Sequence, residues 1–135
     1  MIRFWLSLLY LSLFQSFLLA DEVPSAERDW SVLTQKYTNL EHVSTLRISE
    51  NPRNVTAYSS RGDARMFLGQ FTGARDDYEK MIELDPKLNV SHWRLGIAYF
   101  YLSDFTKAAR QFEIYHEYDN VDRENGIWKF MSQYM

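Results

Sequence analysis

The chain has 135 residues, a formal net charge of −3 and no cysteine. It is too short for a multidomain enzyme or an eight-stranded α/β barrel, and without cysteine it holds no disulfide, thiolate zinc site, iron–sulfur cluster or thiol nucleophile. The mildly acidic balance argues against a nucleic-acid-binding protein, which usually carries a concentrated basic face, and an aromatic content of 16% argues against disorder.

Residues 1–20 differ from the rest because most of them are apolar and Arg3 is the only charged one. A short positive start, an apolar run over residues 4–20 and the small residue Ala20 before Asp21 form the pattern of a secretory signal peptide. The run also reaches the lower limit of length for crossing a membrane. We therefore expect an exported protein, periplasmic or secreted, with a cleaved signal peptide over 1–20, or a protein anchored to a membrane by residues 4–20.

Residues 21–54 carry apolar side chains every three or four positions, which is helical spacing. These side chains belong to Trp30, Leu33, Tyr37, Leu40, Val43 and Leu46. Asn51-Pro52 precedes Asp85-Pro86 by 34 residues. The segment is therefore expected to be an N-terminal helical cap or a degenerate repeat, built as one long helix or as a bent pair.

The next two segments, residues 55–88 and 89–122, align with each other without a gap and share nine identical residues in 34. Turn residues divide each segment into two helical stretches, because Gly69 stops a helix and Ser103 or Asp104 begins one. The expected helices are 55–68 and 72–84 in the first unit, and 89–102 and 106–118 in the second.

Small and aromatic residues stand at matching positions of the two units. Gly62 and Gly96 are expected to let neighbouring helices approach closely, and Tyr78 and Phe112 to fill the space between hairpins. The residues expected to pack the repeat are Tyr58, Gly62, Ala74, Tyr78, Pro86, Gly96, Tyr99, Ala108 and Phe112.

The 34-residue period and these positions resemble the tetratricopeptide-repeat family over residues 55–122. The resemblance implies an all-α fold, a right-handed superhelix of helical hairpins with a helical cap at each end. Arg61 and Arg65 depart from the family, which usually has a large apolar residue and an aromatic there. We expect these arginines to be exposed, or to pair with the run Asp76-Asp77 or with Asp63.

Residues 123–135 are expected to form a C-terminal capping helix. Ile127, Phe130 and Met131 share one face of it, and Trp128 at the edge is expected to pack. Two complete units are fewer than the three that a stable array usually needs. The flanking helices, or a second copy of the chain in a homodimer, must therefore complete the core.

No catalytic or metal-binding motif is present in the sequence. His42, His92 and His116 lie in three different segments, and no two of them have the helical spacing of a metal pair. The run Asp76-Asp77 is expected on an outward, solvated face. We therefore expect neither an enzyme nor a cofactor.

In tetratricopeptide repeats the inner helices present a concave groove to partners. The resemblance implies that the groove here is formed by Asp63, Met66, Phe67, Trp93, Arg94, Ile97, Phe100 and Tyr101. Exposed aromatic side chains of this kind are typical binding anchors. Chaperone-binding members of the family hold a C-terminal carboxylate with lysine and asparagine at positions 5 and 9 of the first unit. This chain has Ser59 and Asp63 there, which disfavours that role.

The expected function is therefore a non-catalytic adaptor that binds a peptide or protein partner in the groove, without nucleic acid. The chain resembles, more weakly, the small periplasmic tetratricopeptide-repeat adaptor proteins of bacteria, some of which are dimeric. The alternative is a membrane-anchored structural subunit that acts through oligomerisation.

Overall fold

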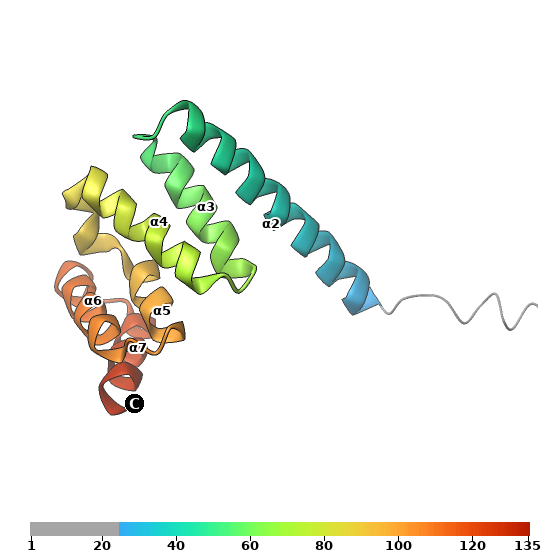
Figure 1. The fold of residues 1–135 in the computed structure, drawn as a ribbon. Helices are drawn as coiled ribbons and strands as arrows, with labels where there is room; N and C mark the ends of the chain where they lie inside the picture. The colour runs from blue at the N-terminus through green and yellow to red at the C-terminus, as the bar shows by residue number, and fades with distance from the viewer. Residues whose placement is uncertain (1–24) are drawn as a thin grey trace, which may run out of the picture. The chain divides into compact units, whose positions relative to one another are not determined.

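The computed structural model describes residues 25–135, with side chains from Asp29 onward, so the expected signal or anchor lies outside the described residues. The chain divides into two compact units, residues 1–33 and 34–135. In the first unit, the described residues form the start of a helix; the second unit holds everything discussed below. The helices are α2 (Ser25–Glu50), α3 (Val55–Phe67), α4 (Phe71–Leu84), the 3-10 helix η1 (Pro86–Ser91), α5 (Trp93–Tyr101), α6 (Phe105–Tyr118) and α7 (Arg123–Tyr134) (Figure 1).

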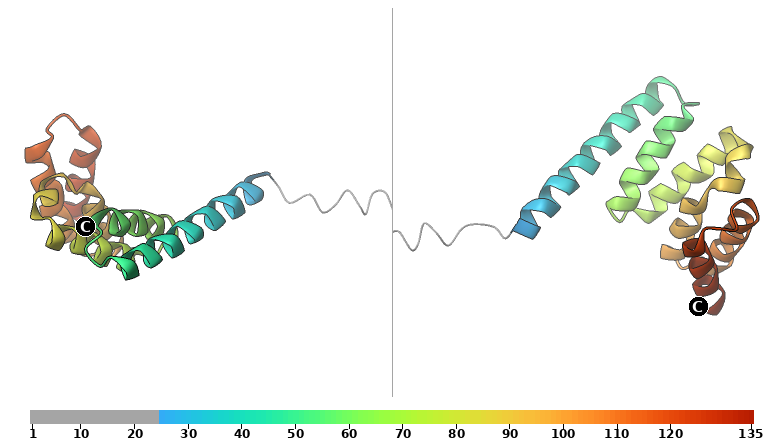
Figure 2. Two further views of the ribbon diagram at one scale, coloured as in Figure 1. Left: turned by 90° about the horizontal axis from the view of Figure 1, so that it is seen from above. Right: turned by 180° about the vertical axis from the view of Figure 1, so that it is seen from behind.

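Successive helices pair into hairpins, as the sequence predicts. Helices α3 and α4 form one antiparallel pair, α5 and α6 form the next, and α7 packs on α6. Figure 1 and the view from behind in Figure 2 both show α3 between α4 and the last turns of α2. The prediction of an all-α fold of helical hairpins is confirmed.

The two hairpins turn in the same way with different residues. Gly69 ends α3 with a φ of 73°, and Ser103, 34 residues later, ends α5 with a φ of 61°. This is the left-handed region, which glycine adopts freely and serine does not. Asp104 then caps α6 by accepting a hydrogen bond from the Lys107 backbone N–H at 3.3 Å.

Glycines set the distance between the paired helices. A Cβ atom on Gly62 would lie 2.5 Å from Tyr78 Cε1, and one on Gly96 would lie 2.8 Å from Phe112 Cζ. The Tyr78 and Phe112 rings are fully buried there. Of the nine residues expected to pack the repeat, all are buried except Pro86, which is exposed at the start of η1.

Residues 86–91 correct the expected start of the second unit. The sequence predicts an α-helix from residue 89, but a 3-10 helix precedes α5. The Asp85 carboxylate accepts a hydrogen bond from the Lys87 N–H at 3.2 Å, and Gln111 Nε2 on α6 donates to the Asn89 carbonyl at 2.9 Å. These bonds hold the segment in its tighter turn before α5 begins.

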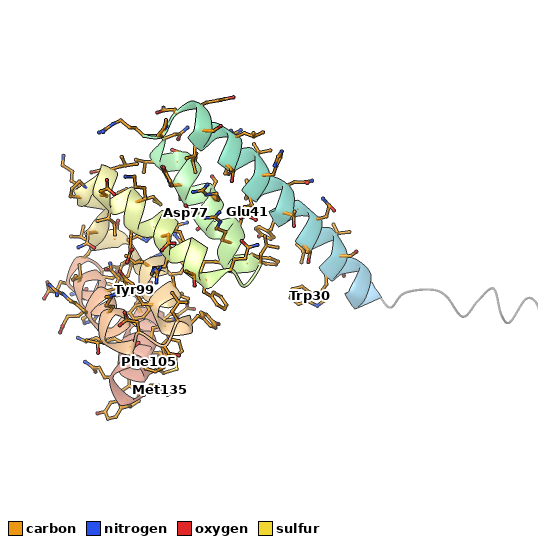
Figure 3. The ribbon with its side chains drawn as sticks, in the orientation of Figure 1. Trp30, Glu41, Asp77, Tyr99, Phe105 and Met135 are labelled. Carbon is orange, nitrogen blue, oxygen red and sulfur yellow. The ribbon has the colours of Figure 1, made fainter. Side chains whose placement is uncertain are left out.

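Asp77 corrects a second expectation, because it lies inside the protein with 2% of its side chain exposed. Arg61 Nη2 lies 2.7 Å from Asp77 Oδ1, and Arg65 Nη1 lies 3.0 Å from Asp77 Oδ2. Arg65 Nε also donates to Glu41 Oε1 on α2 at 2.9 Å. Figure 3 labels Glu41 and Asp77, on the two sides of α3. Asp76 alone lies on the exposed face as expected, since consecutive helical residues point about 100° apart.

Helix α2 is continuous from Ser25 to Glu50, and its inner face is not the apolar one that the spacing predicts. Val43 and Leu46 are 41% and 50% exposed, whereas Ser44 is fully buried and Ile48 packs against the core. The inner face is partly polar because α2 meets the two arginines of α3 rather than an apolar surface.

Helix α7 likewise presents part of its predicted apolar face to solvent. Ile127 and Phe130 are each 59% exposed, while Asn125 and Ser132 are buried. Their polar groups are satisfied locally, since Asn125 Nδ2 donates to the Asp122 carboxylate and Ser132 Oγ donates to the Trp128 carbonyl at 2.8 Å.

Candidate functional site

A pocket of about 490 Å³ lies on the inner side of the two hairpins. It holds seven of the eight residues that the sequence places in the groove. Phe100 is the exception, because its ring packs edge-on against Phe105 and Trp128. The lining residues are Tyr37, Asp63, Met66, Phe67, Phe71, Tyr78, Trp93, Arg94, Ile97, Tyr101 and Trp128.

Stacked aromatic pairs form the walls of the pocket. The ring of Tyr37 on α2 stacks on Phe67 with centroids 3.8 Å apart, and Phe71 at the start of α4 stacks on Tyr101 at 4.5 Å. Phe67 and Tyr101 are nevertheless 42% and 53% exposed, and Trp93 is 40% exposed. The walls therefore offer flat apolar surface to a ligand.

The polar part of the pocket is one connected group of side chains. Arg94 on α5 binds the carboxylate of Asp63 on α3 through Nη1 and donates from Nη2 to Ser59 Oγ at 3.2 Å. Tyr78 on α4 donates its hydroxyl proton to Asp63 Oδ1 at 2.8 Å. Burial and the hydrogen bond to Asp63 raise the pKa of Tyr78 above its ordinary value, so this hydroxyl stays protonated and keeps donating.

His92 lies directly behind this group. Its ring is 4.8 Å from the Tyr78 ring, it is buried, and neither ring nitrogen has a hydrogen-bond partner. Burial, and the nearby charge of Arg94, lower its pKa to about 4. The imidazole is therefore neutral at pH 7 and packs as an aromatic ring.

Four lining residues were absent from the groove predicted from the sequence. Tyr78 and Trp128 had been assigned to packing, and each does both, since Trp128 also stacks on Phe112 with centroids 6.1 Å apart. Tyr37 lies outside the recognised repeat, and Phe71 begins an outer helix. Phe71 and Phe105 occupy the same position in the two repeat units. That match predicts a similar turn in both hairpins, but it does not predict that Phe71 lines the pocket.

Metal chemistry finds no support in residues 25–135, where no cluster of three or more histidine, aspartate or glutamate side chains is placed to hold an ion. The pocket contains an ion pair and a tyrosine hydroxyl, and these groups hold one another in place. The arrangement suits binding of a largely apolar segment.

No protein-family model matches the chain. Among curated proteins it is 30% identical over 101 residues to Hsp70-Hsp90 organizing protein 3 of Arabidopsis thaliana, covering 73% of this chain and 18% of that protein. It is 31% identical over 78 residues to a Protein SGT1 homolog of Oryza sativa subsp. japonica, covering 58% of this chain and 21% of that protein. The chain thus spans about a fifth of the length of these relatives.

Two solved structures share the fold. The TPR2B domain of yeast Sti1, in a complex with pHsp70, superposes with a TM-score of 0.63 at 23% identity over 73% of this chain and 84% of that one. The Sgt2 TPR domain of Aspergillus fumigatus gives 0.62 at 24% identity over 80% of this chain and 73% of that one.

These relatives overturn the expected location. They are named as an Hsp70-Hsp90 organizing protein and a Protein SGT1 homolog, and against them the expectation of export to the periplasm or medium, or of an anchor at residues 4–20, is wrong. Within residues 25–135, every helix is too short or too polar to cross a membrane. The weaker resemblance to bacterial periplasmic adaptors also finds no support among the relatives.

The relatives agree with the broader functional prediction. The Arabidopsis protein is named for organizing Hsp70 and Hsp90, and this name is consistent with a protein-interaction role rather than with an enzyme. The same fold is indicated by the 34-residue period of the sequence, by the helical hairpins and by the two similar solved structures. The chain carries the repeat and the fold of tetratricopeptide-repeat domains.

Proposed function

We propose that this chain binds a segment of a partner protein by holding a bulky apolar side chain in the pocket between the two hairpins. The observation that carries the proposal is the pocket itself, which has a volume of about 490 Å³ and six aromatic rings among its lining residues besides that of Tyr78. Pockets of this size and composition are typical of specific ligand sites.

The exposure of the wall residues supports binding rather than packing. Trp93 and Tyr101 are large and still 40% and 53% exposed, whereas the aromatic residues that pack the repeat, Tyr78, Tyr99 and Phe112, are buried. Tryptophan and tyrosine are the residues that most often supply a large share of binding energy at protein interfaces.

The names of the relatives indicate the class of partner. They name Hsp70 and Hsp90, so a chaperone or a protein that works with chaperones is the first partner to test. The positions that hold a chaperone's terminal carboxylate in the family carry Ser59 and Asp63 here. We therefore propose that the apolar side chain, and not a chain terminus, is the anchor.

The test is a selection of peptides from a displayed random library on wild-type protein, followed by affinity measurements on the selected peptides by calorimetry. The double variant Trp93→Ala, Tyr101→Ala is expected to bind them at least about tenfold more weakly, since each hot-spot residue typically contributes more than 1 kcal/mol. The matched control is Tyr118→Ala, Val121→Ala, which removes two exposed apolar side chains that lie outside the pocket and outside α7. Equal affinity of the wild-type protein and the pocket variant would refute the proposal.

A homodimer is a second proposal, supported by the outer face of α7. Ile127, Phe130 and Tyr134 recur at helical spacing and are 59%, 59% and 75% exposed. A second copy would cover this face and extend the core. Sedimentation equilibrium should then give twice the chain mass for the wild-type protein and the chain mass for Phe130→Glu; a monomer in both samples excludes this proposal.

A further inference from the structure

We propose that Asp63 determines which ligands the pocket accepts, because its carboxylate fills the anion receptor that Arg94 would otherwise offer. This inference rests on the proposed function and assigns a chemical preference to the same pocket. Its consequence is that the pocket accepts an uncharged apolar group and rejects one that carries a carboxylate beside it.

The geometry shows that Arg94 and Tyr78 already direct donors to groups of the chain itself. Arg94 directs Nη1 to both oxygens of Asp63 and Nη2 to Ser59, while the Tyr78 hydroxyl approaches Asp63 from α4. The donors to Asp63 come from two helices, α5 and α4, and converge on one carboxylate of α3 that belongs to the chain itself. A planar guanidinium facing a carboxylate in this way is the arrangement by which proteins usually bind an anionic ligand.

The charges lead to the same conclusion. Among the residues that line the pocket, Asp63 and Arg94 are the two that carry a charge at pH 7, and they neutralise each other. Their side chains are 40% and 32% exposed, so a ligand in the pocket can reach both. An entering carboxylate would meet the negative charge of Asp63 before it could bind Arg94. Repulsion of this kind is a common way to exclude a competing ligand.

Removing the charge of Asp63 should therefore reverse the preference. Asp63→Asn keeps an oxygen that can accept the Tyr78 hydrogen bond, so the fold is retained, but it frees Arg94 from its anionic partner. Asp76→Asn is the matched control, because Asp76 carries the same charge on α4, is 57% exposed and does not line the pocket.

The probes are N-acetylphenylalanine amide and N-acetylphenylalanine, which share an aromatic group and differ in their terminal charge. Binding is followed by NMR through the indole N–H signals of Trp93 and Trp128, which both line the pocket. We expect the wild-type protein and Asp76→Asn to prefer the amide. In Asp63→Asn the ratio of the two dissociation constants should shift by at least about tenfold toward the acid, and Asp63→Asn, Arg94→Gln should lose that gain.

The outcomes separate this inference from the proposed function. The same acid-to-amide ratio in the wild-type protein and Asp63→Asn, or an equal shift in Asp76→Asn, would overturn the role of Asp63 while leaving the pocket a binding site. If neither probe moves an indole signal of the wild-type protein, the proposed pocket fails; acid binding that then appears only in Asp63→Asn still supports the role of Asp63. Silence in both proteins would overturn both ideas.

Discussion

Arg61 and Asp77 face each other in a two-pronged ion pair, with Arg61 Nη2 2.7 Å from Asp77 Oδ1 and Arg61 Nε 3.0 Å from Asp77 Oδ2. The carboxylate is buried and also binds Arg65, which in turn binds Glu41 on α2. The hydrogen bond to Asp77 raises the pKa of Arg61 above its already high ordinary value. Through Arg65, this network of two carboxylates and two arginines links three successive helices.

Replacing Asp77 by alanine should destabilise the protein by about 3 kcal/mol or more, because it leaves two arginines partly buried without their common partner. Urea unfolding followed by circular dichroism measures the change. Asp76→Ala, on the same helix but 57% exposed, should alter the unfolding free energy by less than about 0.5 kcal/mol. Similar losses in the two variants would show that the ion network contributes no special stability.

Alanine at Gly62 or Gly96 should also destabilise the fold. The new Cβ would lie within 2.5 Å of the Tyr78 ring or 2.8 Å of the Phe112 ring, and forcing a methyl group into such a contact typically costs about 1–3 kcal/mol. Gly126 in α7 is the control, since nothing lies within 4 Å of its Cβ position. Gly126→Ala should raise the melting temperature, because alanine has the higher helix propensity. Alanine at Gly62 or Gly96 should lower the melting temperature instead.

Ser103→Gly should stabilise the protein by about 1 kcal/mol. Ser103 adopts a φ of 61°, which costs a residue with a Cβ about 1–2 kcal/mol and costs glycine much less; the greater freedom of glycine in the unfolded chain offsets part of the gain. The reciprocal change, Gly69→Ser, should destabilise by a similar amount. Thermal unfolding of both variants checks the pair, and a loss of stability in Ser103→Gly would contradict the interpretation.

His92 should make the fold sensitive to mild acid. Its pKa is about 4 in the folded protein and about 6.5 in the unfolded chain, so below pH 6.5 the unfolded chain takes up a proton that the folded protein does not. Stability from this group is therefore complete above pH 6.5, falls as the pH drops and is lost by about pH 4.

The change between pH 7 and pH 4.5 should amount to about 2 kcal/mol. In His92→Phe, which keeps an aromatic ring against Tyr78, that part of the pH dependence should disappear. His116→Gln, which removes an exposed histidine of α6 and leaves His92 in place, is the matched control. The measurement is urea unfolding at several pH values, and an unchanged pH profile in His92→Phe would exclude the histidine as its source.

Features that depend on local spacing could be predicted from the sequence. The 34-residue period located the helices of the two hairpins to within about one residue, except at the start of α5, because Gly62 with Tyr78 and Gly96 with Phe112 repeat the same contact. The turn at residue 103 was also found without a glycine, since the aligned Gly69 marked its place.

Features that depend on long-range charge pairing were only partly predictable. The arginines at positions 61 and 65 do pair with the acidic run, one of the alternatives considered, but the same run had been assigned to a solvated face. A single helix pattern cannot show that Arg61 and Arg65 of one helix converge on Asp77 of the next, or that Arg65 also binds Glu41 on a third helix. The predicted set of pocket residues was also incomplete, because Tyr37 reaches the pocket from a helix outside the recognised repeat.

Tyr78 belongs both to the packing of a hairpin and to the pocket, whereas its counterpart Phe112 belongs to the packing and does not line the pocket. Its ring fixes the spacing of the first hairpin at Gly62, and its hydroxyl ends in the pocket on Asp63. A ligand that binds the folded pocket raises the unfolding midpoint by mass action. Because Tyr78 belongs to both the pocket and the first hairpin, the same ligand also acts on the packing of that hairpin. A simple melting curve of the unlabelled protein is therefore a direct screen for partners, and Tyr78→Phe is the variant in which the hairpin remains packed while the pocket loses its link to it.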